Sequence, residues 1–135
     1  MKITYKAGYP YQLRMPYQCT IALKPQRYIG TGYIRLYTDG GLCLSNGYAW
    51  DGPSGPVAHD KTIMRGSLIH DALYQLLRDR HLPPEAREAA DRALQQACIE
   101  DGMPRWKAWL VYQAVRLFGE PAADPASERP LLTAP

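Results

Sequence analysis

A histidine followed directly by an aspartate, with a tyrosine one helical turn later, is the arrangement in this sequence best suited to chemistry: His70, Asp71 and Tyr74. On a helix, His70 and Tyr74 share a face, because residues four apart are neighbours. Asp71 points about 100° away from that face. The pattern therefore predicts a general base at His70, with Asp71 left free to bind a cation.

Asp91 is the expected partner of His70. Apolar spacing predicts two helices, over residues 62–77 and 84–100, joined by a turn around residues 79–83. In an antiparallel hairpin, His70 and Asp91 lie at similar distances from that turn, so their side chains can meet. A carboxylate on one imidazole nitrogen fixes the tautomer and raises the basicity of the other nitrogen. The spacing predicts a His70–Asp91 dyad, with a buried structural polar pair as the alternative interpretation.

Residues 45–61 form an irregular segment rich in glycine and proline just before the first helix. Such a segment inside a compact domain is usually functional or disordered, and its tyrosine and tryptophan argue against disorder. Its backbone carbonyls could join Asp71 in the all-oxygen shell that suits Ca²⁺. A plain connector is the alternative. His59 and Asp60 with His70 and Asp71 also hint at a metal-dependent His-Asp phosphohydrolase, although such enzymes need more helices and ligands than this chain offers.

The elements that must position these residues divide the chain into two halves. Eight of the ten tyrosines lie in the first 48 residues, where aromatic and β-branched residues are broken by glycine and proline. This composition predicts short strands and turns. Residues 33–37 read as a strand, residues 38–41 as a hairpin turn and residues 42–44 as the partner strand.

Three helices are expected after the loop, over residues 62–77, 84–100 and 104–119. In the third helix, Trp106, Trp109 and Phe118 are expected in the core, with a lipid-binding face as the alternative. We predict one α+β domain over residues 1–119. In it, a small antiparallel β-rich part (residues 1–47) is joined by the loop (residues 48–61) to an antiparallel helix pair plus a third helix (residues 62–119). Residues 120–135, with four prolines, are expected to be a flexible tail.

Composition and charge exclude several classes of protein. No apolar run reaches the roughly 20 residues that span a bilayer, and the first six residues lack the apolar core of a signal peptide. The three cysteines form no CxxC pair, so neither a disulfide framework nor a zinc knuckle is expected. Residues 1–47 carry a charge of +5, but the net charge of +3 is too small to indicate nucleic-acid binding. A solvated basic face is the default interpretation.

One resemblance rests on motifs spread over about residues 30–119. The sequence is similar to an uncharacterised family common in tailed bacteriophages and prophages. The motifs are Gly47-Tyr48-Ala49-Trp50-Asp51-Gly52-Pro53-Ser54-Gly55-Pro56, His70-Asp71-Ala72-Leu73-Tyr74, Ala90-Asp91 and Ala114-Val115-Arg116-Leu117-Phe118-Gly119. This resemblance implies a viral origin, and with it a place in the host cytoplasm or the virion, but no particular activity.

A second, more distant resemblance covers about 45 residues, from the loop to Asp91. A glycine-rich loop, a His-Asp-x-x-Tyr helix and an aspartate on an antiparallel helix resemble the secreted phospholipases A2. The resemblance implies that His70 activates water and that Tyr74 and Asp91 orient it. It also implies a Ca²⁺ site made by Asp71 and the loop carbonyls of Trp50, Gly52 and Ser54. Asp51 is an addition to the pattern of that family and could be an extra cation ligand. The cysteines that flank these motifs in the phospholipases are absent here.

Two functional hypotheses from different classes remain open. One is a calcium-dependent lipid or ester hydrolase, whose partner would be a phospholipid or a membrane surface. The other is a non-catalytic phage structural protein of the virion or tail, or a host-interaction protein, that keeps the same scaffold. Other phage structural proteins would then be its partners. The oligomeric state is not fixed by the sequence.

Overall fold

A computed structural model describes residues 3, 5, 6, 11–53 and 60–125 of the chain. Within this part the strands are β1 (Tyr5–Lys6), β2 (Tyr11–Leu13), β3 (Tyr17–Thr20), β4 (Ile29–Gly30), β5 (Ile34–Leu36), β6 (Gly41–Leu44) and β7 (Ala49–Trp50). The helices are α1 (Met64–Arg78), α2 (Arg87–Glu100), α3 (Arg105–Phe118) and α4 (Glu120–Ala123), and single 3₁₀ turns at Lys61–Ile63 and Pro84–Ala86 lead into α1 and α2.

The strands form two antiparallel sheets, in the orders β1-β2-β7 and β3-β6-β5-β4. The predicted hairpin is β5–β6, in which Ile34 lies opposite Leu44 and Leu36 opposite Leu42. All four side chains are buried, since alternate residues of a strand point to one face. Gly40 closes the turn at a φ of +91°, a conformation that glycine adopts without strain.

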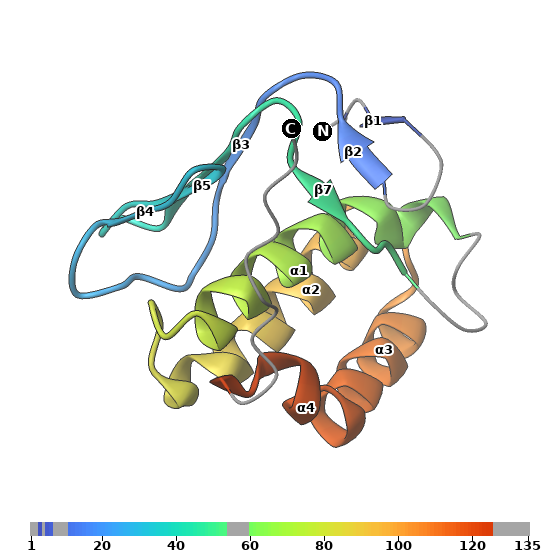
Figure 1. The fold of residues 1–135 in the computed structure, drawn as a ribbon. Helices are drawn as coiled ribbons and strands as arrows, with labels where there is room; N and C mark the ends of the chain where they lie inside the picture. The colour runs from blue at the N-terminus through green and yellow to red at the C-terminus, as the bar shows by residue number, and fades with distance from the viewer. Residues whose placement is uncertain (1–2, 4, 7–10, 54–59, 126–135) are drawn as a thin grey trace.

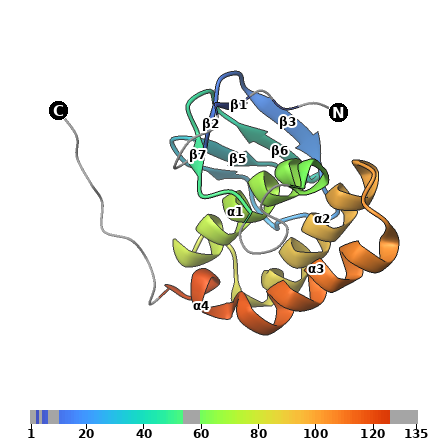
Figure 2. The same cartoon turned by 90° about the vertical axis from the view of Figure 1, so that its right-hand side faces the viewer.

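Helix α1 is the centre of the molecule. The sheets lie on one side of it and α2 and α3 on the other (Figures 1 and 2). The approach of α1 to α2 is close at Gly66, where a Cβ atom would come within 2.9 Å of Leu94 Cδ1 and 3.1 Å of Cys98 Sγ. The predicted α+β fold, with an antiparallel helix pair under a small sheet, is confirmed. No helix of the described residues is both long and apolar enough to cross a membrane.

Two expectations for the C-terminal part differ from the structure. Trp106, Trp109 and Phe118 are 67 %, 53 % and 78 % exposed, so their assignment to the core is wrong. Helix α3 buries only a narrow stripe of smaller residues and one tyrosine: Ala108, Val111 and Tyr112. Residues 120–123, expected in the flexible tail, instead form α4, and Ala123 is buried; residues 126–135 lie outside the described part.

Candidate functional site

Asp91 is the centre of a polar network between α1, α2 and α3. Its side chain has no exposed surface. Asp91 Oδ1 lies 2.7 Å from His70 Nε2 and accepts a hydrogen bond from the Tyr74 hydroxyl at 2.6 Å. Asp91 Oδ2 accepts a hydrogen bond from Arg116 Nη1 at 2.9 Å. The predicted contact between His70 and Asp91 is therefore present, and the catalytic roles of the two residues stay a prediction.

The His70 ring is held in one orientation. Nε2 faces Asp91, and the ring stacks at a tilt on Tyr74 with a centroid distance of 4.0 Å. Among the described residues, every fully buried side-chain nitrogen or oxygen has a hydrogen-bond partner. Nδ1 of His70 has none among them, so it is not fully buried, although His70 as a whole is only 8 % exposed.

Two arginines that the spacing argument left out complete the network. Arg87 Nη1 lies 3.7 Å from Asp91 Oδ2, one turn earlier on α2. The Arg87 guanidinium also donates to the backbone carbonyls of Val115 and Arg116 at 3.1 and 3.2 Å. These carbonyls are in the last turn of α3, where a cation is favoured by the helix dipole. Arg87 thus fixes the end of α3, and with it the position of Arg116.

The network keeps Asp91 ionised. Burial alone would raise the pKa of this carboxyl, but hydrogen bonds from His70, Tyr74 and Arg116 outweigh burial and lower the pKa below its ordinary value. The pKa of the Tyr74 hydroxyl is raised, by burial and by its hydrogen bond to Asp91. Tyr74 therefore remains a proton donor to Asp91, and Asp91 fixes the proton of His70 on Nε2.

Asp71 faces the loop after β7 rather than Asp91, and its surroundings differ from those of Asp91. Burial raises the pKa of Asp71 to about 6, and the negative charge of Asp51 adds to this rise; the charges of His70 and Arg78, and a hydrogen bond from the backbone N–H of Asp51, act in the opposite direction. The loop after β7 is thereby attached to α1 beside the candidate base. Two neighbouring carboxylates, one of them partly buried, supply the oxygen ligands that a hard cation such as Ca²⁺ prefers.

Contacts of Trp50 and Gly52 fix the start of the loop. Trp50 is buried and its indole Nε1 donates to Ser67 Oγ at 3.1 Å, one turn before His70. Gly52 has a φ of +81°, and a Cβ atom there would meet the Tyr11 ring. Ser54, the third predicted carbonyl ligand, lies outside the described residues. Within the described part, no cluster of three His, Cys, Asp or Glu side chains is suited to a metal ion, so a cation would need backbone oxygens.

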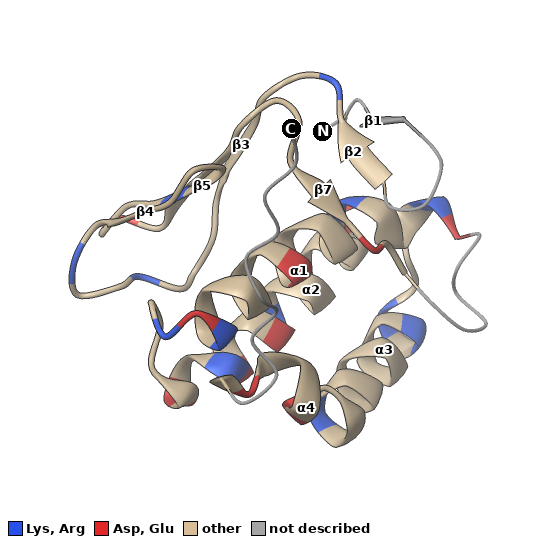
Figure 3. Cartoon of the chain, viewed as in Figure 1, with Lys and Arg blue, Asp and Glu red and all other residues tan. Residues whose placement is uncertain are grey.

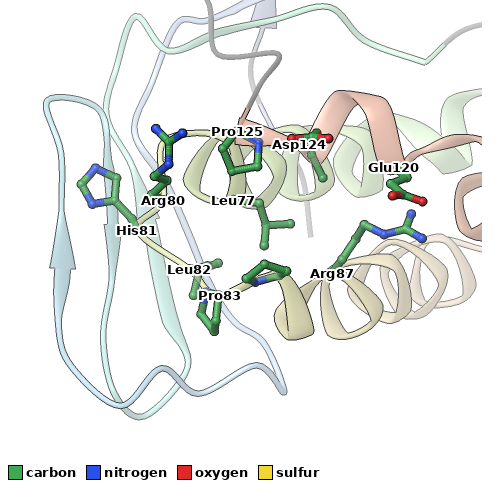
Figure 4. A pocket seen from close by; sticks show the side chains of 11 residues that line it. Leu77, Arg80, His81, Leu82, Pro83, Arg87, Glu120, Asp124 and Pro125 are labelled. Carbon is green, nitrogen blue, oxygen red and sulfur yellow. The ribbon is translucent and has the colours of Figure 1, made fainter.

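A groove of about 780 Å³ lies beside this network, between the α1–α2 turn and α4 (Figure 4). Leu77, Leu82 and Ala123 form part of its apolar wall, and Arg87 lies at one end beside Glu120. Neither His70 nor Asp71 lines the groove. Arg87 is the residue of the polar network that lines the groove, and the candidate base His70 is not part of its lining.

The two missed arginines carried different signals in the sequence. Arg87 precedes Asp91 by four residues, the spacing of an ion pair on a helix. Asp91 lies ten residues before Asp101, at the end of α2, and Arg116 lies eleven residues after Arg105, at the start of α3. His70 was paired with Asp91 because both lie a similar number of residues from the turn between their helices. The same counting, applied to the turn between α2 and α3, pairs Asp91 with Arg116.

Comparison with known proteins assigns the chain to a family. Residues 44–115 match the family described as "Protein of unknown function (DUF1353)". The match covers more than half of the chain, which therefore belongs to this family. It includes His70, Asp71, Tyr74 and Asp91 and ends one residue before Arg116. No curated protein and no solved structure matches the chain.

Proposed function

We propose that this chain is a calcium-dependent hydrolase of lipids or other esters, similar in its site to the phospholipases A2. The observation that carries the proposal is the orientation of His70: Nε2 is held by an ionised, fully buried Asp91 at 2.7 Å, and Nδ1 has no hydrogen-bond partner among the described residues. A histidine in this state can accept a proton from a water molecule.

In the proposed reaction, a water molecule attacks the ester carbonyl carbon while His70 Nδ1 takes its proton. The C–O bond to the alcohol then breaks, and the imidazolium returns the proton to the leaving oxygen. The products are a carboxylic acid and an alcohol. Asp91 stabilises the imidazolium, and Tyr74 keeps the Asp91 carboxylate in place through its 2.6 Å hydrogen bond.

The residues proposed to hold calcium are Asp71, Asp51 and the backbone carbonyls of Trp50, Gly52 and Ser54. The raised pKa of Asp71 supports this choice, because a cation would relieve both its burial and its repulsion by Asp51. The chemistry that calcium supplies when bound is stabilisation of the negative charge on the carbonyl oxygen.

The test is fatty-acid release from mixed phospholipid vesicles, with calcium and with a chelator. We expect release only with calcium. His70→Gln should lower the rate by at least about 100-fold, the scale of a lost general base, with folding and calcium binding kept. Asp71→Asn should lower calcium affinity and rate together. His81→Gln is the matched control, since His81 is exposed in the α1–α2 turn. No release from the folded chain under either condition would refute the proposal.

A second candidate is a non-catalytic phage structural or host-interaction protein, located in the virion or the host cytoplasm. The observation in its favour is that Asp91 contacts groups from three helices, His70, Tyr74, Arg87 and Arg116, as a structural polar network would. The origin in a phage or prophage is also proposed, from the motif resemblance alone. If His70→Gln, Asp71→Asn and Asp91→Asn change only stability, this candidate is favoured.

A further inference from the structure

The outer face of α3 is an apolar surface that the fold leaves uncovered. Four large side chains are more than half exposed there: Trp106, Trp109, Leu110 and Leu117. Single exposed apolar residues need no explanation, but a contiguous group of them marks an interaction site. We call these four residues the α3 face.

The α3 face is continuous because of the helical period. Trp106, Trp109, Leu110 and Leu117 fall within about 100° of one another around a helix axis. The opposite side of α3 packs on α2 through Ala108 and Val111. In Figures 1 and 2, α3 lies on the side of the molecule away from the sheets. From Trp106 to Leu117 the stripe therefore faces outward over about three turns.

The charges of α3 are of one sign. The helix carries Arg105, Lys107 and Arg116 and no Asp or Glu, so Figure 3 shows only basic positions along it. Lys107 and Arg116 are partly used in ion pairs with Asp60 and Asp91, and they remain 35 % and 29 % exposed. A helix with Trp and Leu on one side and basic residues beside them is the composition that lies in the plane of a membrane surface.

We propose that the α3 face binds the surface of a lipid bilayer that contains anionic lipids. Trp106 and Trp109 would lie at the level of the headgroups, as tryptophan does at membrane interfaces. Leu110 and Leu117 would enter the acyl boundary, and Arg105 would contact anionic headgroups. This proposal rests on the α3 face and does not depend on the proposed hydrolysis. If the chain is a hydrolase, membrane binding through α3 would hold a lipid substrate at the protein surface.

The charge pattern disfavours a second copy of the chain as the occupant. A two-fold contact brings the same patch of both subunits together. Lys107 and Arg116 of each copy already have acidic partners in Asp60 and Asp91, so the charge brought to such a contact is Arg105 of each copy, with no acidic residue on α3 to compensate it. An anionic bilayer accommodates the same charges favourably.

The experiment is binding of the full chain to vesicles in the presence of EDTA, so that neither calcium nor hydrolysis contributes. Vesicles of phosphatidylcholine with phosphatidylglycerol are compared with vesicles of phosphatidylcholine alone, by sedimentation and by quenching of tryptophan fluorescence with brominated lipids. Quenching reports on Trp106 and Trp109, because Trp50 is only 3 % exposed. We expect binding to the mixed vesicles, with weaker binding to the neutral ones.

The variant Trp106→Ser/Leu110→Ser should weaken binding by at least about tenfold, and Arg105→Gln should weaken binding to the mixed vesicles by about fivefold. Met15→Ser is the matched control, since Met15 is 58 % exposed on the β half; it should bind like the parent, as should His70→Gln. The proposal is overturned if neither vesicle is bound, if the α3 variants bind unchanged, or if ultracentrifugation shows a dimer that these variants dissociate. Vesicle binding without hydrolysis would leave this proposal standing and refute the hydrolase.

Discussion

Arg116 and His70 bind opposite oxygens of one buried carboxylate, that of Asp91. The Arg116 guanidinium is 2.9 Å from Oδ2, and the His70 imidazole is 2.7 Å from Oδ1. The two residues come from α3 and α1, which meet through α2 at this point. The candidate base is therefore oriented by a carboxylate whose charge is balanced by Arg116, a residue 46 positions after His70 in the chain.

The first prediction concerns Arg116. Arg116→Met removes a charged partner of a buried carboxylate while keeping an unbranched apolar stem. We expect the free energy of unfolding to fall by about 1–3 kcal/mol, less than for a fully buried pair because Arg87 remains near Asp91. Urea denaturation measures the change. Arg105→Met, an exposed arginine on the same helix, should alter stability by less than about 0.5 kcal/mol. Equal effects of the two variants would contradict the assigned role of Arg116.

The second prediction separates orientation from cation binding. Asp91→Asn keeps the shape of the side chain but loses the charge that supports a protonated His70. We expect the rate of ester hydrolysis to fall at least about tenfold, with calcium affinity unchanged because Asp91 lies away from Asp71. Calorimetric titration with calcium and the initial rate of fatty-acid release are the two measurements. A variant that loses calcium affinity along with rate would place Asp91 in the cation site.

The third prediction concerns the loop. Gly52 combines a φ of +81° with a Tyr11 ring where its Cβ would lie, so Gly52→Val strains the backbone and displaces a side chain. We expect calcium affinity to fall while far-UV circular dichroism shows intact helices. Gly32→Val is the control, because a Cβ at Gly32 meets nothing within 4 Å. Unchanged calcium affinity in Gly52→Val would remove the loop from the mechanism.

The fourth prediction is a pH dependence of stability set by Asp60. Hydrogen bonds from Lys107 and Thr62 lower the pKa of Asp60 to about 2, below the value of about 4 in an unfolded chain. The folded state thus favours the charged carboxylate. Its contribution to stability is complete above about pH 4 and is lost as the pH falls toward 2. In Asp60→Asn, the melting temperature should therefore depend less steeply on pH in this window.

The Asp60 prediction has an internal check. Lys107→Met removes the partner of Asp60 on α3, where Nζ and Oδ2 are 2.5 Å apart, and should flatten the same pH window in part. At pH 7, Asp60→Asn should lower the free energy of unfolding by about 1 kcal/mol, the scale of a helix cap together with a surface ion pair. Identical pH slopes in the parent and both variants would rule out this role of Asp60.

Local pattern and chain length were sufficient to predict the central contact of the site. His70 and Asp91 were paired by counting residues from the α1–α2 turn, and a helix hairpin with a short turn leaves little freedom in that register. The β5–β6 hairpin was likewise predicted by Gly40 and Gly41 at its turn. The same counting across the α2–α3 turn also pairs Asp91 with Arg116, which was named from the sequence only as part of the motif over residues 114–119.

The exposure of α3 could not be read from its composition. Trp106 and Trp109 are the types of residue that usually fill a core, and periodicity shows only that they share a face. Which face of a helix packs depends on its neighbour. The surface of α2 accepts Ala108 and Val111, so the bulky face points outward.

The dependence of Asp91 on Arg116 has a consequence for the order of assembly. During synthesis α1 and α2 leave the ribosome before α3, so Asp91 at first lacks the Arg116 guanidinium, and Arg87 lacks the α3 carbonyls that fix it. A buried carboxylate short of its counter-charge is costly, and the α1–α2 hairpin therefore reaches its native pairing when α3 docks. In native-state hydrogen exchange, the amides of the three helices should accordingly open as one cooperative unit.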